Sequence, residues 1–139
     1  MSVPPLAARL GMEPHPEGGW FVRTWTASAT VETPGGTRPA ATLIQFLLPA
    51  GEASAWHMVS SDEIWLWHWP GQLALQLGGT GSDPDPDGAV HLLGSPDGNA
   101  AAQVLVPAGT WQRTVPAPSD VLVSCLVSPG FDYADWRLR

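Results

Sequence analysis

Short apolar segments separated by turn residues dominate the chain. Apolar or alternating positions occupy residues 20–25, 42–49, 53–59, 63–69, 73–77, 90–94, 103–107 and 121–127. Each segment has the length of a strand, and turn residues such as Gly, Pro, Asp and Ser separate them. Roughly seven to nine short strands at this spacing predict an all-β sandwich or barrel. Little helix is expected, apart from one short helix within residues 1–12 that Leu6, Ala7 and Leu10 support.

The segments between these strands carry turn chemistry. Residues 26–41 contain Pro-Gly-Gly and Arg-Pro, which predict an irregular, mobile connection. We expect residues 90–94 and 103–107 to pair as a hairpin around Ser-Pro-Asp-Gly-Asn. Fifteen Gly and fifteen Pro residues fit many short strands with tight turns, and 139 residues fit one domain spanning residues 1–139.

The densest group of chemically active side chains lies in residues 51–71. Side chains alternate across a strand, so an inward His57 brings Ala55 and Val59 inward with it. On the next strand an inward Glu63 shares its face with three tryptophans: Trp65, Trp67 and Trp69. The polar turn between the strands can place His57 beside Glu63. An imidazole and a carboxylate can bind a metal or form an acid–base pair.

Composition and charge exclude several classes of partner and location. The formal net charge is −7, and all six basic residues are Arg, so neither nucleic acid nor an anionic membrane is expected as a partner. The N-terminal residues contain no long apolar run, which predicts neither a signal peptide nor a membrane span. Cys125 is the single cysteine, and we expect a buried, inert thiol in a reducing compartment, the cytoplasm.

One acidic stretch resembles a calcium loop. Residues 83–88 read Asp-Pro-Asp-Pro-Asp-Gly, which matches the first half of such a loop. Two prolines interrupt the ligand positions, and Gly94 stands where the loop needs Glu. We therefore expect a solvated acidic loop there.

The central stretch resembles the first motif of the cupin superfamily, Gly-x5-His-x-His-x3-Glu-x6-Gly. Gly51, His57 and Glu63 match it, and Gly71 comes one residue late. Val59 stands in place of the second histidine. The motif is therefore present with one of its metal ligands replaced.

The second cupin motif, Pro-x-Gly-x2-His-x3-Asn, has a counterpart in Val-Pro-Ala-Gly-Thr-Trp-Gln-Arg-Thr-Val-Pro. Pro107 and Gly109 match, Gln112 stands in place of the third histidine, and Pro116 replaces the asparagine. Four segments together resemble the cupin-5 family of small RmlC-like cupins: 14–25, 47–65, 106–112 and 128–138. This resemblance implies an RmlC-like double-stranded β-helix, a jelly-roll barrel, which is commonly paired into a homodimer. It implies no known reaction.

The cupin resemblance places His57, Glu63 and Gln112 around a central pocket. His57 and Glu63 are the candidate catalytic pair. The same three side chains are the candidate metal ligands, but only one of them is an imidazole. No cofactor is therefore assigned beyond a weakly bound divalent ion, and we favour a hydrogen-bonded His57–Glu63 dyad that contacts an organic ligand.

Six side chains are candidates for binding that ligand: Trp65, Trp111, Gln112, Glu17, Arg23 and Tyr133. Indole faces suit sugar rings, nucleobases and aromatic acids, and a Gln amide can donate and accept at once. Glu17 belongs to a constrained turn that can cap the barrel mouth. Arg23 can bind a carboxylate or phosphate bidentately, or pair with a nearby acid. Tyr133 can act as an acid near the pocket, as in sugar epimerases of related fold, or belong to an ordered C-terminal turn.

Three functions fit these candidates. The first is an isomerase- or epimerase-like enzyme that acts on a sugar-like or other small polar organic molecule and transfers protons through His57 and Glu63. The second is a metal-dependent cupin enzyme, and the third is a sensor or carrier that only binds. The outward side chains Trp56, Ile64 and Leu66 would suit the interface of a homodimer.

Overall fold

Residues 2–139 are described by the computed structural model, and β-strands account for nearly all of its regular structure. In chain order the elements are α1 (Pro5–Leu10), β1 (Glu13–Pro14), β2 (Trp20–Thr26), β3 (Thr30–Thr33), β4 (Gly36–Pro39), β5 (Thr42–Leu48), β6 (His57–Val59), β7 (Asp62–Pro70), β8 (Leu73–Leu77), β9 (Val90–Leu93), β10 (Gln103–Val106), β11 (Gln112–Val115), β12 (Val121–Ser128), the 3-10 helix η1 (Tyr133–Asp135) and β13 (Trp136–Leu138).

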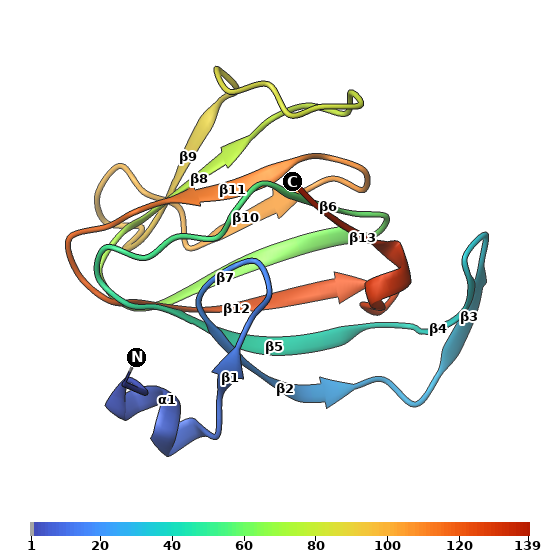
Figure 1. Ribbon diagram of the computed structural model, residues 1–139, viewed down its shortest axis with the longest axis horizontal. Coiled ribbons are helices and arrows are strands. Elements are labelled where there is room, and N and C mark those ends of the chain that lie inside the picture. The colour runs from blue at the N-terminus through green and yellow to red at the C-terminus, as the bar shows by residue number, and fades with distance from the viewer. Residues whose placement is uncertain (1) are drawn as a thin grey trace.

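Strand pairing forms two main antiparallel sheets and a separate hairpin. The larger sheet has the order β1-β2-β5-β12-β7-β10, the smaller sheet has the order β13-β6-β11-β8-β9, and β3 pairs with β4. Figure 1 shows β2, β5, β12 and β7 side by side, with β8, β9 and β11 above them. Consecutive strands such as β5 and β6 lie in different sheets, which is typical of jelly rolls.

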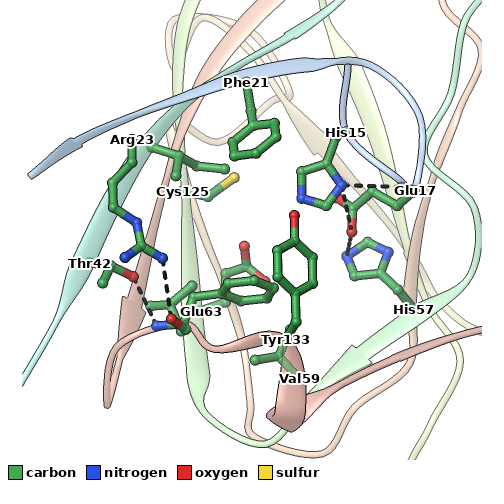
Figure 2. A pocket seen from close by; sticks show the side chains of 13 residues that line it. His15, Glu17, Phe21, Arg23, Thr42, His57, Val59, Glu63, Cys125 and Tyr133 are labelled. Atoms are coloured by element: carbon green, nitrogen blue, oxygen red, sulfur yellow. Dashed lines mark hydrogen bonds and ion pairs between the residues drawn. The ribbon is translucent and has the colours of Figure 1, made fainter. Parts of the chain in front are cut away.

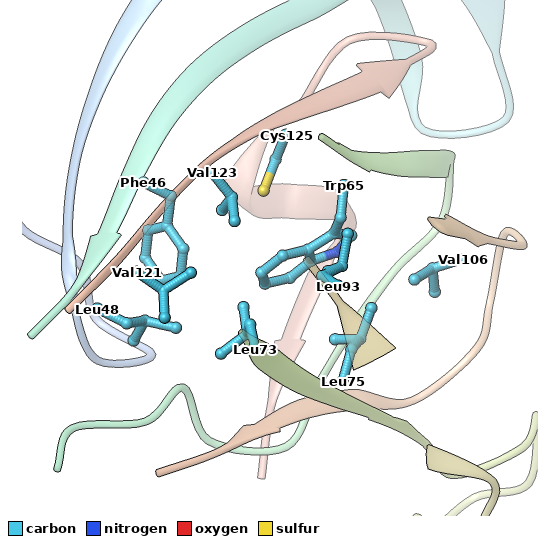
Figure 3. Close-up of a cluster of buried hydrophobic side chains, with 10 residues drawn as sticks. All are labelled: Phe46, Leu48, Trp65, Leu73, Leu75, Leu93, Val106, Val121, Val123 and Cys125. Carbon is cyan, nitrogen blue, oxygen red and sulfur yellow. The ribbon is translucent and has the colours of Figure 1, made fainter. Parts of the chain in front are cut away.

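The hydrophobic core lies between the two sheets. The larger sheet contributes Phe46, Leu48, Trp65, Val106, Val121, Val123 and Cys125, and the smaller sheet contributes Leu73, Leu75 and Leu93 (Figure 3). The rings of Phe46 and Trp65 meet edge to face, with their centroids 5.9 Å apart. Cys125 shares the inward face of β12 with Val123 and Val127, because side chains alternate along a strand, and its thiol is buried and forms no disulfide.

Two predicted connections are wrong. Residues 30–39 form the regular hairpin β3–β4 rather than an irregular connection, since Gly36, with φ of 125°, closes a tight turn. The segments at 90–94 and 103–107 do not pair with each other. Strand β9 pairs with β8 and β10 pairs with β7, so the chain crosses between sheets here. The other predicted strands agree with the structure, except that only the last three residues of 53–59 are a strand. The strands β1, β11 and β13 were not predicted.

A bulge in β7 breaks the predicted alternation of tryptophans. The register with β12 passes from Trp67 opposite Val123 directly to Trp69 opposite Leu122, so His68 is the extra residue. Trp67 still packs against the core, but Trp69 is 54% exposed. The expectation that Trp69 shares the inward face of Glu63 is therefore wrong.

The short helix α1 covers the outer face of the larger sheet. Its buried Ala7 packs with Met12, Trp20 and Leu47. Gly11, with φ of 70°, ends the helix in the left-handed conformation. This docking fixes the start of the segment that leads to β1 and the following turn. Within residues 2–139 no helix is long and apolar enough to cross a membrane.

Candidate active site

The turn between β1 and β2 delivers two side chains to the interior. Gly18 and Gly19 have φ values of 110° and 77°, which residues with a Cβ rarely adopt. A Cβ at Gly18 would collide with the carbonyl oxygen of Ala53, so the turn lies flush against that segment. The backbone N–H of Ala55 donates to the carbonyl of Glu17 at 2.7 Å. The turn is thus held where the Glu17 side chain meets β6.

Glu17 and His57 form a buried pair. Nε2 of His57 lies 3.3 Å from Oε2 of Glu17. On the other side of the ring, Nδ1 lies 2.8 Å from the carbonyl oxygen of Ala55. A carbonyl can only accept, so Nδ1 must carry a hydrogen, and the neutral ring presents the lone pair of Nε2 to Glu17. The indole N–H of Trp136 also donates to Oε2 of Glu17, at 3.3 Å.

Burial decides where the proton of this pair resides. It raises the pKa of Glu17 from 4.5 to about 8, against a smaller lowering from the Trp136 hydrogen bond. Burial also lowers the pKa of His57, despite the opposing charge of Glu63 and the bond to Ala55. Near neutral pH the carboxyl therefore keeps its proton and the imidazole stays uncharged. The pair holds one proton that can be passed to a third molecule.

His15 supports the pair from the aromatic side of the pocket. Its Nδ1 accepts the backbone N–H of Glu17 at 3.1 Å. Its ring lies 4.6 Å from the ring of Phe21 and 6.3 Å from the rings of Tyr133 and Trp136. Burial, with a smaller effect of His57, lowers the pKa of His15 to about 4. His15 is therefore an uncharged support for the turn.

A second buried carboxyl, Glu63, is oriented by a chain of donors. The indole N–H of Trp65 donates to Oε1 of Gln112 at 2.8 Å, and Nε2 of Gln112 donates to Oε1 of Glu63 at 2.8 Å. Because an indole can only donate, the Gln112 amide has one permitted orientation, with its NH2 toward Glu63. Burial raises the pKa of Glu63 to about 7, and the nearby His57 offsets part of that shift. Glu63 is therefore close to half ionised at neutral pH.

These groups line one cavity of about 60 Å³ at the end of the barrel beyond the core (Figure 2). Its walls are His15, Glu17, Phe21, Arg23, Thr42, Ile44, His57, Val59, Glu63, Cys125, Val127, Phe131 and Tyr133. Figure 2 shows Arg23 on one side and His15, Glu17 and His57 on the other, with Tyr133 between them.

A buried ion pair holds the segment that carries Tyr133. Arg38 of β4 donates to both carboxylate oxygens of Asp135, at 2.7 and 3.1 Å. Asp135 lies in η1, two residues after Tyr133. The guanidinium lowers the pKa of Asp135 mainly through these hydrogen bonds. The β3–β4 hairpin therefore anchors the wall segment around Tyr133.

The sequence matches the family described as Cupin superfamily (DUF985) over residues 5–139. This chain belongs to that cupin family. The all-β cupin barrel predicted from the resemblance is confirmed by the two sheets and by this match. No curated protein matches the chain.

Solved structures agree with the family. A hypothetical protein from Leishmania major superposes with a TM-score of 0.85 and 29% identity, over 96% of this chain and 84% of that one. Protein SO0799 from Shewanella oneidensis gives a TM-score of 0.82 and 28% identity, over 96% and 82% of the two chains. The DMSP lyase DddQ from Ruegeria pomeroyi shares the fold at 16% identity and a TM-score of 0.50, over 78% and 46%.

Five side chains predicted for the pocket of this cupin line the cavity. They are His57, Glu63, Glu17, Arg23 and Tyr133. The predicted His57–Glu63 hydrogen bond is replaced by the contact of His57 with Glu17. Arg23 does not pair with an acid in the described residues but donates to the carbonyl of Phe131 at 3.2 Å. Glu63 still acts on His57 through its charge.

Three predicted ligand-binding residues lie outside the cupin cavity. Trp65 is 1% exposed and belongs to the core, and Gln112 lies behind Glu63 as its hydrogen-bond donor. Trp111 points away, with its N–H on the carbonyl of Gly81 and Arg137 over its ring at 5.3 Å. The prediction that Trp65, Trp111 and Gln112 line the pocket is wrong for this cavity. The aromatic wall consists instead of Phe21, Phe131 and Tyr133.

The donor set does not fit the metal centre expected of a cupin. The carboxamide oxygen of Gln112 is turned toward Trp65, so it does not face His57 and Glu63 as a third ligand. Val59 offers no lone pair, although it does line the cavity. Among residues 2–139 no cluster of three or more His, Cys, Asp or Glu side chains has the arrangement to hold a metal ion. No step of the function proposed below runs through a metal.

The contact between Glu17 and His57 in the cupin pocket was not predicted. The two residues are forty positions apart in the chain, and alternation along strands does not indicate which residues from distant segments meet. The signal was the glycine pair after Glu17, whose positive φ values press the turn against the strand region before His57. His15, which lies in the same turn and also lines the cavity, was not among the predicted site residues.

Proposed function

We propose that this cupin binds a small polar organic molecule in the cavity and moves protons on it, as an isomerase- or epimerase-like enzyme. One observation carries the proposal: two buried carboxyls and a neutral imidazole face a single small cavity. The pKa values of the two carboxyls are shifted toward neutral pH, where groups exchange protons most effectively.

The roles follow from the protonation states. Glu63, close to half ionised, accepts a proton from a carbon next to a carbonyl group of the bound molecule. Glu17 holds a proton of its own beside Nε2 of His57 and delivers this second proton to an oxygen of the same molecule. Return of the Glu63 proton to a neighbouring carbon and of the second proton to Glu17 completes an isomerisation with no net change in atoms. The apolar walls exclude water from the exchange.

The fold is compatible with this proposal. The DMSP lyase with a related fold is named as an enzyme, which supports catalysis as one use of the barrel. Its low identity transfers neither its substrate nor its residues. Binding without catalysis, as in a sensor or carrier, is the competing function, and it would use the same cavity.

Solvent deuterium separates the two functions. In D2O, a compound that raises the melting temperature of the wild-type protein is expected to gain deuterium on carbon. Glu17→Gln keeps the size of the side chain but removes the acidic carboxyl proton, so we expect the rate of incorporation to fall at least about 100-fold. Glu32→Gln, an exposed change on β3, serves as the control. Binding without any incorporation in the wild type would refute the enzyme and support a carrier.

We propose a homodimer formed through the outer face of the larger sheet. One register row across four strands is apolar, with Leu43 opposite Leu126, Leu126 opposite Ile64, and Ile64 opposite Leu105. Leu105 is 54% exposed and the others are half-buried. The row contains no charge on a chain of net charge −7, so a second copy can approach here without repulsion. Leu66 lies one row away on this face.

Trp56 does not belong to this face, because its ring lies under the Arg113 guanidinium of β11 at 4.6 Å. Ile64→Arg is expected to convert a dimer into a monomer in sedimentation experiments, because two guanidinium groups would have to be buried against leucines. Val31→Arg on β3 is the matched control and should leave the mass unchanged. A wild-type monomer at tens of micromolar would contradict the proposal.

Net charge and the single cysteine bear on other partners and on the cellular location. The net charge of −7 gives no reason to propose nucleic acid or an anionic membrane as a partner. Cys125 is buried and unpaired, which fits a reducing compartment, and we propose the cytoplasm.

A further inference from the structure

Arg23 is the one cationic side chain among the residues that line the cavity. It lies in β2, across the pocket from the Glu17–His57 pair (Figure 2). Elsewhere in residues 2–139, Arg38 pairs with Asp135 and Arg139 with Asp83, but none of the ion pairs includes Arg23. A positive charge at the cavity is thus left without a counterion from the described chain.

Most of the hydrogen-bonding capacity of Arg23 is free. A guanidinium has five N–H donors in a planar fork, and here one of them donates to the Phe131 carbonyl through Nη2, at 3.2 Å. The remaining donors include pairs with the spacing of the two oxygens of a carboxylate. That single bond to the backbone holds the guanidinium at the pocket and leaves it able to bind an anion.

The other residues at the Arg23 end of the cavity are compatible with a bound anion. Phe21 and Phe131 supply apolar walls, and Thr42, whose hydroxyl accepts the backbone N–H of Phe131 at 3.0 Å, fixes the loop beside the guanidinium. At the far end, burial keeps Glu17 protonated and raises the pKa of Glu63 to about 7, so repulsion of an anion is weak below that pH. The two ends of the cavity therefore differ in chemistry.

We propose that the ligand is a short-chain carboxylic acid, bound as its anion, with the carboxylate on Arg23 and a hydroxyl or carbonyl oxygen at Glu17–His57 and Glu63. This names the substrate class for the function proposed above and rests on it. The cavity volume of about 60 Å³ is far below the ~300–1,000 Å³ of drug-sized pockets, which favours acids of only a few carbon atoms. The guanidinium fork can bind a carboxylate or a phosphate, but its single positive charge balances a carboxylate fully and a phosphate dianion only by half.

Matched compounds test this assignment. At pH 6.5 and constant ionic strength, lactate, pyruvate and glycerate are compared with lactamide and glycerol by titration calorimetry. We expect the acids to bind wild-type protein, and Arg23→Gln to weaken them roughly 10- to 100-fold, the loss typical of a charge-assisted hydrogen bond. The neutral compounds should bind both proteins equally weakly.

Arg9→Gln is the matched control, since Arg9 is exposed on α1 at the outer face of the sheet. It removes the same charge from the chain and should leave the affinity for the acids unchanged. Arg23→Lys, which keeps the charge but loses the fork, should give an intermediate affinity. Near-ultraviolet circular dichroism checks that Arg23→Gln retains the native packing.

The outcomes separate this inference from the proposed function. Neutral polyols that bind more tightly than the acids, or acids that bind Arg23→Gln as well as wild type, overturn the carboxylate while leaving a pocket that binds and exchanges protons. Tighter binding of inorganic phosphate or a phosphate ester also overturns it. Acids that bind through Arg23 but gain no deuterium in D2O sustain the carboxylate and refute the isomerase. If none of the acids binds, the inference is wrong.

Discussion

Trp65→Phe is expected to lower the free energy of unfolding by about 2–4 kcal/mol. The substitution leaves a void in the core and removes the indole N–H that Gln112 accepts at 2.8 Å. Gln112 is 1% exposed, so its carbonyl oxygen would lose its donor in a place that bulk water does not reach. Chemical denaturation of the variant and of wild type measures the loss.

Trp69→Phe is the matched control, because Trp69 lies on the same strand but is 54% exposed. Its expected change is within about 0.5 kcal/mol. If Trp65→Phe loses less than about 1 kcal/mol, the amide of Gln112 has found another donor. The orientation of Glu63 by this chain of hydrogen bonds would then be wrong.

The second large effect is on the pH dependence of stability. We expect the free energy of unfolding to fall by about 2 kcal/mol between pH 6.5 and 8, and Glu17→Gln to remove most of that fall. Burial raises the pKa of Glu17 from 4.5 to about 8, so the folded protein keeps a proton that the unfolded chain has released. The contribution of Glu17 is therefore full below pH 4.5 and is lost as the pH rises through 8.

His15 changes the free energy of unfolding in the opposite direction from Glu17, and over a lower pH range. Its pKa is lowered from 6.5 to about 4, so its effect on stability grows as the pH rises from 4 to 6.5 and is constant above. Glu63 adds a smaller part of the fall, because its contribution to stability is lost as the pH rises through its pKa of about 7. Measurements between pH 6.5 and 8 thus isolate the carboxyls.

Urea denaturation at several pH values in this range checks the prediction. The exposed change Glu32→Gln should keep the wild-type profile, since it leaves the buried carboxyls in place. A flat wild-type profile, or an equal fall in Glu17→Gln, would mean that Glu17 is ionised in the folded protein. The proton assigned to the Glu17–His57 pair would then be absent.

The strands and the inward faces were predictable because their signal is local. Alternation with a period of two places His57 and Glu63 on inward faces, and both do line the cavity. The same rule put Cys125 on the face of Val123 and Val127. A run of residues carries this information without reference to distant parts of the chain.

The contacts that define the chemistry were not predictable in the same way. His57 meets Glu17 rather than Glu63 because a turn with two glycines of positive φ docks against residues 53–55. Trp69 leaves the inward face because one inserted residue, His68, shifts the register of β7. Both depend on backbone conformation that composition and periodicity do not encode.

The cupin motifs placed Gln112 beside His57, and in the structure β11 pairs with β6 so that Gln112 lies opposite His57. They did not show which way the amide faces. That depends on Trp65, whose indole can only donate, and the result is a residue that supports Glu63 from behind instead of touching the ligand. The predicted and observed pockets therefore differ at Gln112 in the direction of its side chain rather than in its position along the strand.

The pocket is built from both ends of the chain. Glu17 comes from the turn after β1, and its hydrogen-bond donor Trp136 lies 119 residues later, in the last strand. During synthesis the barrel strands of the middle region emerge first without that donor, and Tyr133 follows only just before it. The Glu17–His57 pair therefore acquires this donor only after Trp136 has been synthesised, so a chain that stops before β13 has no finished binding site.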